Sequence, residues 1–479
     1  MIILGTNSIK DTGFDVANSC RFNSGSSDFL GANQFSNTAF DSTKKFTLSV
    51  WVKKTSNGVN NSIFGAESNV GSDGKTTQFY FDTSDQLRFY DNFNNVSDVK
   101  TNRVFRDNSA FYNIILAVDY TQSTNSNRVK IIVNGEQETS LATSTYANQN
   151  DNITALQQNR GIILGVNENS GGTKYGYFNG YMSEFVFLDG IAADQTSFGE
   201  FDEDSGIWKP IDVSGLTFGT NGFYLDFENS GALGADVSGN TNNFTVNNLT
   251  AIDQSTDTCT TNFATMNPLA PANISSASEG NLKILQSSSG GSVISTFGFS
   301  SGKWYWEVEL DSQVNYTQLA GVIKESKMES ALLTSFNVGA NDGGWGYFLQ
   351  GNSDNGKAFH NNTASSAYTT MSAGNILSIA VDSDNGKIFF AVNGTYVNSG
   401  NPANGTGAVY TNLPTGENLF PAITNYVGDG STATLLMNFG SPPYSESGGE
   451  TDGNGYGNFA HAVPSGYYAL NTKNLAEYG

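Results

Sequence analysis

Three carboxylates stand at alternate positions in one short run of the sequence. Glu307, Glu309 and Asp311 follow a Lys-Trp-Tyr-Trp segment, and side chains two residues apart in a strand point to the same face. Retaining glycosidases need two such carboxyl groups, a nucleophile and a general acid, beside the scissile bond. The same alternation is that of an ordinary strand with one solvated face. We interpret the three groups as such a face and expect no catalytic residue in the chain.

The other residues with catalytic or metal-binding chemistry are few and scattered. His360 and His461 are the two histidines, which argues against a Ser-His-Asp triad and against a site with several His ligands. Cys20 and Cys259 have no second Cys or His at metal-ligand spacing. Cys20 fits the alternation of a strand, so we expect it to be buried as a small apolar residue, and both thiols to be free.

One loop resembles the start of a calcium-binding loop. Residues 382–386 read Asp-Ser-Asp-Asn-Gly, but the glycine comes one residue early and no glutamate stands at position 12. The run therefore favours a tight hairpin between two strands.

Aromatic residues give the one candidate for ligand contact. Tyr175, Tyr177 and Tyr181 share one parity around two glycines, so a strand there would present their rings to one side, where sugar rings could stack. Packing of the same rings in a core is the competing and favoured interpretation. Trp304, Trp306 and Trp345 lie in strand-core patterns, and we expect at least two of them to be buried.

Composition narrows the class of protein. The 479 residues are enough for two or three domains, and 53 Gly, only 9 Pro and 14% charged residues are typical of many short strands joined by polar turns. The net charge of -22 repels nucleic acid and anionic lipid and leaves neutral or cationic partners. The first residues lack the features of a signal peptide, and no apolar run is long enough to predict a membrane span.

Alternating runs predict the strands. They lie at residues 46–52, 78–81, 86–90, 113–120, 128–137, 160–166 and 180–188, and then at 303–310, 345–349, 376–382 and 387–393. A short helix is possible near 192–201. Regular strand spacing with so little helical periodicity indicates an all-β protein of two tandem antiparallel β-sandwiches.

Breaks in this pattern predict the organisation of the chain. Residues 235–275 lose the alternation and become rich in Asn, Thr and Ser, which is typical of a linker. We therefore predict an N-terminal arm at 1–16, a first sandwich at 17–234, the linker, a second sandwich at 276–440 and a Gly-, Asn- and Tyr-rich tail at 441–479. The tail is expected to be irregular as far as Tyr467, and to dock back or reach a neighbour.

The first block resembles the laminin-G-like, concanavalin A-like lectin and glucanase superfamily over residues 17–230. The matching stretches are 46–53, 114–120 leading to Val133-Asn134-Gly135, and 178–184. The resemblance implies a jelly-roll sandwich, and such sandwiches often hold one calcium ion at their rim. The loops offer Asp73, Asp82, Asp85 and Asp91, from which the spacing selects no ligand set.

The second block is similar to SPRY modules over residues 280–440. The matching stretches are 302–309, Gly344-Trp345-Gly346-Tyr347, 376–382, 386–394 and 419–422. This resemblance implies a second sandwich and places His360 in a strand.

The combination of blocks resembles proteins encoded by phages of marine bacteria. Further matching stretches are 17–23, 238–248 and 464–472. The resemblance implies a non-enzymatic structural protein made in the host cytoplasm and exposed on the virion. It would be a tail fibre or appendage, with homotrimers as the expected state and other virion proteins or a host-surface glycan as partners. The alternatives are a capsid or tail decoration protein without a receptor, and a glucanase-like enzyme with two carboxylates in a groove.

Overall fold

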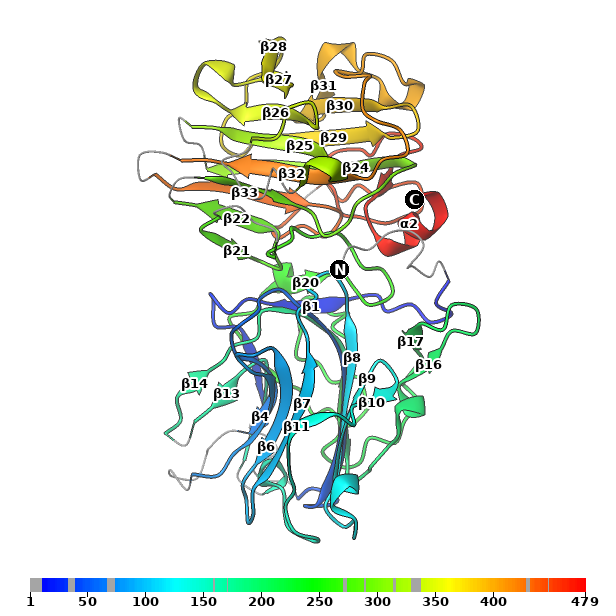
Figure 1. The fold of residues 1–479 in the computed structure, drawn as a ribbon. Coiled ribbons are helices and arrows are strands. Elements are labelled where there is room, and N and C mark those ends of the chain that lie inside the picture. The colour runs from blue at the N-terminus through cyan, green and yellow to red at the C-terminus, as the bar shows by residue number, and fades with distance from the viewer. Residues whose placement is uncertain are drawn as a thin grey trace. The chain divides into compact units, whose positions relative to one another are not determined.

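The computed structural model describes residues 11–32, 39–66, 74–157, 160–169, 171–269, 274–287, 290–312, 316–328, 337–427, 431–446 and 448–479. The chain divides into an N-terminal unit, residues 12–260, and a C-terminal unit, residues 261–479, to which Asp11 also belongs. Both are built almost entirely from antiparallel strands, which confirms the predicted all-β fold class (Figure 1).

The N-terminal unit contains two eight-stranded sheets. The first has the order β10 (Glu136–Gln137), β9 (Val129–Val133), β8 (Tyr112–Asp119), β3 (Lys45–Lys54), β15 (Gly180–Asp189), β1 (Ser19–Phe22) and β20 (Gln254–Ser255), with β18 (Phe223–Leu225) also paired to β15. The second has the order β11 (Leu141–Thr145), β7 (Ser97–Val104), β6 (Gln86–Asp91), β5 (Thr77–Phe81), β4 (Asn61–Ala66), β12 (Ile162–Leu164), β2 (Phe29–Ala32) and β19 (Thr245–Asn247). Two small hairpins are β13 (Asn167–Glu168) with β14 (Lys174–Tyr175), and β16 (Gly199–Phe201) with β17 (Trp208–Pro210).

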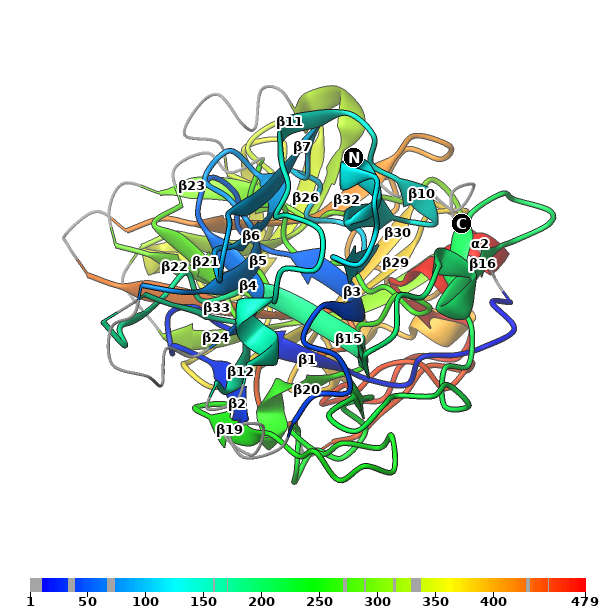
Figure 2. The same ribbon diagram turned by 90° about the horizontal axis from the view of Figure 1, so that it is seen from below.

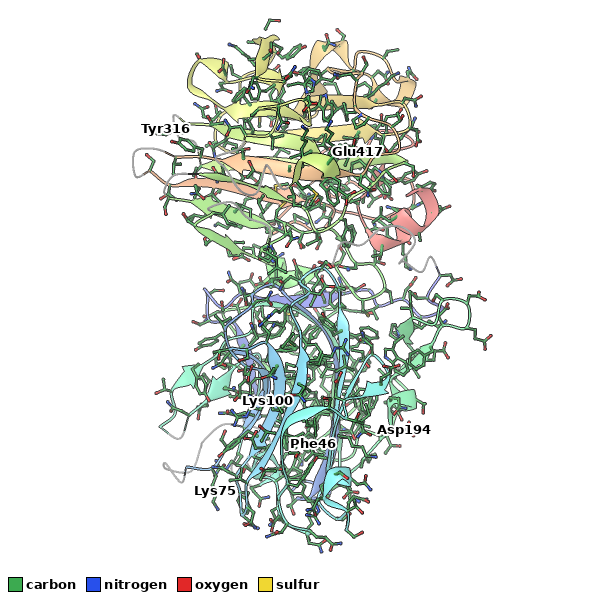
Figure 3. All side chains as sticks on the ribbon, in the orientation of Figure 1. Phe46, Lys75, Lys100, Asp194, Tyr316 and Glu417 are labelled. Carbon is green, nitrogen blue, oxygen red and sulfur yellow. The ribbon has the colours of Figure 1, made fainter. Side chains whose placement is uncertain are left out.

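Phenylalanine rings fill the space between these sheets. Phe187 of β15 stacks on Phe46 of β3 with ring centroids 5.3 Å apart, and on Phe64 of β4 in the other sheet at 5.8 Å. Phe223 of β18 stacks on Phe187 at 5.3 Å, and Figure 3 labels Phe46 within this layer. Offset ring pairs of this kind add to the stabilisation that comes from burying apolar area.

The predicted linker is wrong over its first 26 residues, 235–260, which belong to the N-terminal unit. β19 and β20 extend the two sheets by pairing with β2 and β1, and Phe244 and Leu249 join the core. Lys53 and Asp257, both fully or almost fully buried, form an ion pair across this junction. The low alternation of the segment gave no sign of this, because its strands are only two or three residues long and pair with strands far away in the sequence.

The C-terminal unit also has two sheets. The first has the order β21 (Ser276–Ser278), β22 (Lys283–Gln286), β33 (Ala433–Asn438), β24 (Lys303–Ser312), β29 (Ile376–Asp382), β30 (Lys387–Val392) and β31 (Thr395–Tyr396), with β34 (Tyr468–Ala469) parallel to β24. The second has the order β23 (Gly291–Ile294), β32 (Leu419–Asn425), β25 (Gln318–Lys324), β26 (Gly344–Gln350), β27 (Lys357–His360) and β28 (Thr363–Ala367).

Three sequence predictions for this unit are confirmed. Trp304, Trp306 and Trp345 are all buried. Asp382 ends β29, and the turn to β30 forms the predicted hairpin, in which the Asp382 carboxylate accepts the amide N–H of Asn385 at 3.1 Å. His360 lies in a strand, β27.

Helices are short throughout the described residues. The 3-10 turns are η3 (Asn125–Asn127), η4 (Thr154–Leu156), η5 (Gln195–Ser197), η6 (Ala251–Asp253), η7 (Glu325–Lys327), η8 (Asn352–Asp354), η9 (Val397–Ser399) and η10 (Pro402–Asn404), and the α-helix is α2 (Thr472–Tyr478). The helix predicted near 192–201 is only η5. None of the helices described is long and apolar enough to cross a membrane.

The C-terminal tail docks on its own unit, which was one of the two predicted alternatives, and its first strand begins after Tyr467, as predicted. β34 pairs with the first half of β24, and α2 follows, with the Asn471 side chain accepting the amide N–H of Asn474 as its N-cap. Phe459 and Tyr467 are buried against Tyr305 in one apolar cluster. The tail therefore covers the face of β24 that carries the alternating carboxylates.

This docking contradicts the interpretation of Glu307 as solvated. Its side chain is fully buried, with Oε1 accepting the Tyr305 hydroxyl at 2.8 Å and the His461 amide N–H at 2.9 Å. Oε2 accepts the amide N–H of Ala460 at 2.9 Å. Burial raises the pKa of Glu307 to about 7, although these hydrogen bonds oppose the rise. Glu309 is partly exposed and Asp311 is exposed. Exposure of the three carboxylates therefore increases along β24 from Glu307 to Asp311.

Replacing Asp257 tests the extended boundary of the N-terminal unit. The Asp257→Ala variant would leave the buried ammonium of Lys53 without the carboxylate that it contacts, and removing one partner of a buried pair costs about 3–5 kcal/mol. We expect a loss of that size in the free energy of unfolding, measured by chemical denaturation. The exposed Asp204→Ala change is the control and should have little effect. If residues 235–260 were a free linker, both variants would match the wild type.

Glu307 should make the stability of the C-terminal unit depend on pH. Its folded-state pKa of about 7 lies above that of an exposed glutamate, so the folded state binds the proton of Glu307 more tightly than the unfolded state does. The stabilisation that results is complete below about pH 4.3 and is lost as the pH rises through about 7. We expect the wild type to lose up to about 3 kcal/mol relative to Glu307→Gln between pH 4 and pH 8. Denaturation of both proteins across this range measures the difference, and a constant difference would contradict the prediction.

Candidate functional site

Two rows of side chains cross the outer face of β5, β6 and β7 in the N-terminal unit. The strand register places Gln78, Tyr90 and Asp98 in one row and Tyr80, Arg88 and Lys100 in the next. Their neighbours along each strand, such as Phe79, Phe89 and Val99, point into the core. Figure 2 shows these strands side by side, and Figure 3 labels Lys100. We call the six side chains, together with Tyr175, the tyrosine face.

Arg88 holds the centre of the tyrosine face in a fixed geometry. Its Nε and Nη2 donate to the two carboxylate oxygens of Asp98 at 2.8 and 2.7 Å, and its Nη1 donates to the Tyr80 hydroxyl at 3.1 Å. The hydrogen bonds to Asp98 raise the pKa of Arg88 above its usual value. A bidentate pair of this kind fixes orientation as well as adding energy. The side chains of Arg88 and Asp98 remain 31% and 17% exposed, so both can also contact a ligand.

The β13–β14 hairpin adds a tyrosine to this face. Gly176, which follows β14, accepts the amide N–H of Ser62 in β4 at 3.0 Å, which anchors the hairpin to the sheet. The Tyr175 hydroxyl then accepts a hydrogen bond from the Gln78 amide at 2.6 Å. Tyr175 therefore lies over the row that contains Tyr90, and both rings are partly exposed.

The three tyrosines proposed from the sequence are not one platform. Tyr177 packs beside Phe29, with ring centroids 6.3 Å apart. Tyr181 is fully buried and lies under the Lys53 ammonium, which is 5.0 Å from its ring centroid. The shared parity fails because Gly176, with φ of 63°, and Gly180, with φ of 143°, break the extended backbone between them. Of the three, Tyr175 alone joins the tyrosine face.

The residues of the tyrosine face on β5 and β6 were not predicted from the sequence, although the alternation of these two strands indicated which side they lie on. β5 and β6 were both predicted as strands, and their alternation places Gln78 with Tyr80, and Arg88 with Tyr90, on the side opposite the phenylalanines. Two adjacent strands with polar and aromatic residues on their solvent side indicate a surface built for contact. The pairing of Arg88 with Asp98 requires the strand register and could not be read from spacing.

The acidic residues suggested for calcium do not converge. Asp73 lies outside the described residues. Asp82 accepts the amide N–H of Ser84, Asp85 pairs with Lys54, and Asp91 accepts the amide N–H of Thr154. Asp91 is fully buried, and burial raises its pKa to about 6. Among the residues that the structure describes, no three His, Cys, Asp or Glu side chains are grouped so that they could hold a metal ion.

The remaining candidates have structural surroundings. Cys20 is buried, as predicted, and Cys20 and Cys259 are both free thiols. The His360 ring stacks on Trp345 with centroids 4.8 Å apart, and its Nδ1 lies 2.8 Å from the carbonyl oxygen of Gly344. Glu307 is enclosed by the tail, so it cannot reach a bound sugar together with Glu309.

Comparisons with known proteins agree with the two units. Residues 27–193 match the family model described as the concanavalin A-like lectin/glucanases superfamily, and residues 303–441 match the SPRY domain. In a search of curated proteins, no sequence matches this chain. The N-terminal unit thus contains a concanavalin A-like segment and the C-terminal unit contains a SPRY segment.

Solved structures similar to this chain include SPRY domains and a pentraxin. The SPRY domain of human HERC1 is 15% identical, with 36% of this chain and 96% of that chain covered and a TM-score of 0.29. The TRIM65 PSpry domain is 18% identical, with 36% and 89% covered and a TM-score of 0.28. A heptameric SAP-like pentraxin from Limulus polyphemus is 11% identical, with 36% and 77% covered and a TM-score of 0.27. SPRY and laminin-G-like domains are typically non-catalytic binding modules, and a binding or structural role follows for this chain.

Proposed function

We propose that the chain is a non-enzymatic structural protein of a phage virion and that the tyrosine face of its N-terminal unit contacts a glycan on the host surface. The observation that carries the glycan contact is the fixed Arg88–Asp98 pair beside the partly exposed Tyr90, with the partly exposed Tyr175 bonded to Gln78 on the other side of Tyr90. The virion context is supported by the sequence resemblance, which spans both units and the segments around them.

The chemistry of the tyrosine face suits a neutral sugar. A pyranose ring has an apolar side that can pack on a tyrosine ring, and vicinal hydroxyl groups that both donate and accept hydrogen bonds. Arg88 and Lys100 supply donors, while Asp98 supplies acceptors. A net charge of -22 disfavours a strongly anionic glycan at long range.

The absence of a catalytic role is part of the proposal. Retaining and inverting glycosidases place two carboxyl groups about 5–5.5 Å or 6.5–9.5 Å apart beside the bond that they cleave. Asp98, which is paired with Arg88, is the one carboxylate among the side chains of the tyrosine face, so this face does not offer such a pair of carboxyl groups. Incubation of the purified protein with β-glucans should release no reducing sugar. Release that Asp98→Asn abolishes would favour the glucanase alternative.

Substitution of the exposed tyrosine tests the glycan contact. We expect Tyr90→Ala to weaken binding to a glycan selected from an array of bacterial surface polysaccharides by about tenfold, as expected for loss of about 1.4 kcal/mol of ring contact. Tyr177→Ala, which changes a tyrosine next to Phe29 and off this face, is the matched control and should bind like the wild type. Isothermal titration with the selected glycan measures both.

Two results would count against the proposal. Binding of no glycan on the array would favour a decoration protein without a receptor. A glycan that binds Tyr90→Ala and the wild type equally would place the contact elsewhere. Imaging of intact particles with antibody against the chain tests the virion context separately, since it does not depend on which surface binds.

A further inference from the structure

The edge of the first sheet in the N-terminal unit lies between two hollows. β9 has β8 on one side, and on its other side the two-residue β10 is the one strand paired with it in the described part of the chain. A polar pocket of about 300 Å³ and a groove of about 490 Å³ both reach this edge, and Asn127 and Gln137 line both. An incompletely paired edge with space on both faces is where another strand can add.

The polar pocket lies on the outer side of the sheet. Lys130 and Ile132 of β9 form one wall, and Asp119 and Asp194 lie on the others. Figure 3 labels Asp194 on this side of the unit. Burial opposes ionisation of Asp119, but hydrogen bonds from Thr121 and Gln122 hold its pKa below the usual value. Two carboxylates and one ammonium leave the pocket with an excess of negative charge.

The groove lies on the inner side, between the two sheets. Its floor is the buried Val129 and Ile131 of β9 with Val99 of β7, and Leu141 of β11 forms part of its wall. Ser144, which pairs with Val99 in the register of β11 and β7, also lines it. The groove can therefore take an apolar side chain that adds to the edge of the core.

The two hollows alternate along one strand. Val129 and Ile131 face the groove, while Lys130 and Ile132 face the pocket. A strand laid along this edge would direct successive side chains to opposite faces in the same way. Successive residues of the added strand would enter the groove and the pocket in turn. A sugar has no side chains that alternate every second unit and would not fill both hollows in this way.

Backbone groups at this edge point toward the added strand. The Arg128 carbonyl oxygen and the Asn134 amide both bond to β8, at 2.8 and 2.9 Å. The odd-numbered residues of β9 therefore point their N–H and C=O groups away from β8. The Ile131 carbonyl oxygen accepts the amide N–H of Glu138 at 2.8 Å, after which the chain leaves to form β11. Val129 precedes Ile131 by two residues and therefore lies beyond the part of β9 that β10 and Glu138 pair with.

We propose that the edge of β9 beside Val129 binds an extended segment of another protein, in which apolar residues alternate with lysine or arginine. The apolar side chains enter the groove and the cationic ones enter the pocket beside Asp119 and Asp194. The negative charge of the pocket and of the whole chain favours the cationic residues. This binding mode is separate from the tyrosine face, which lies on the outer side of the second sheet.

A displayed library of random octapeptides, selected against the full chain, tests the proposal. The enriched peptides should alternate apolar and basic residues, and a labelled synthetic copy should bind in a fluorescence anisotropy titration. Ser144→Phe, which fills the groove, should weaken its binding by at least about tenfold. Asp194→Asn removes one charge from the pocket and should weaken it by a smaller factor. Thr143→Phe lies on the other face of β11, paired with Lys100, and should leave peptide binding unchanged.

Hydrogen exchange gives a readout at the level of single amides. Bound peptide should slow exchange at Val129 and leave Lys130, whose amide faces β8, unchanged. If Ser144→Phe fails to fold, Thr139→Trp at the rim of the same groove replaces it.

The proposal fails if no peptide is enriched, if the enriched peptides lack alternation, or if filling the groove leaves their affinity unchanged. It also fails if a glycan, and no peptide, is displaced by filling the groove. Tyr90→Ala should leave peptide binding intact, so a failure of the glycan proposal is distinguishable from a failure of this one.

Discussion

The layer of aromatic rings between the two sheets of the N-terminal unit determines which of its side chains can contact other molecules. Phe46, Phe64, Phe187 and Phe223 stack across this layer, and each strand that contributes a ring inward must direct its neighbours outward. Phe79, Phe89 and Val99 of β5, β6 and β7 belong to the same core, so the residues beside them on each strand point outward. The Arg88–Asp98 pair and the tyrosines beside it therefore stand on strands that the core holds in place. Side chains that are fixed before binding lose less entropy when a ligand binds.

Segments that lack this alternation are held by buried polar and charged groups. Lys53 with Asp257 fastens residues 255–260 to the first sheet, and Glu307 fastens the C-terminal tail by accepting two backbone N–H groups. Burying such groups is costly unless every hydrogen-bonding atom finds a partner. These buried groups therefore add little net stability. Their main effect is to allow only one position of the segment, in which all of their hydrogen bonds are made. The same cost appears as the raised pKa of Glu307.

These two ways of holding the chain explain how much the sequence could predict. The strands with period two, such as β3, β15 and β24, were found because their pattern is local. Residues 235–260 were assigned to a linker because their partners are more than 100 residues away, as for Lys53 with Asp257. For the tail, docking was left as one of two alternatives, because its partner Glu307 is also distant in sequence from Ala460. At the candidate site, core packing, the favoured interpretation, holds for Tyr181, and the three tyrosines do not share one face, since parity does not survive two glycines in conformations with positive φ. The Arg88–Asp98 contact depends on strand register, which no spacing rule reveals.

The edges of the sheets obey a further constraint, since a strand without a neighbour exposes its backbone groups. Proteins that remain monomeric commonly protect the edges of their sheets with charged residues, proline or a covering loop. β9 carries one charged residue, Lys130, in a strand that otherwise reads Val-Ile-Ile-Val, and β10 covers only its end. The chain turns away at Glu138 to reach β11, although two more residues would have continued the pairing toward Val129. That departure leaves a hollow on each face of β9, although Val129 and Ile131 stay buried. Open space beside apolar side chains forgoes packing contacts, which a segment bound in the groove would supply.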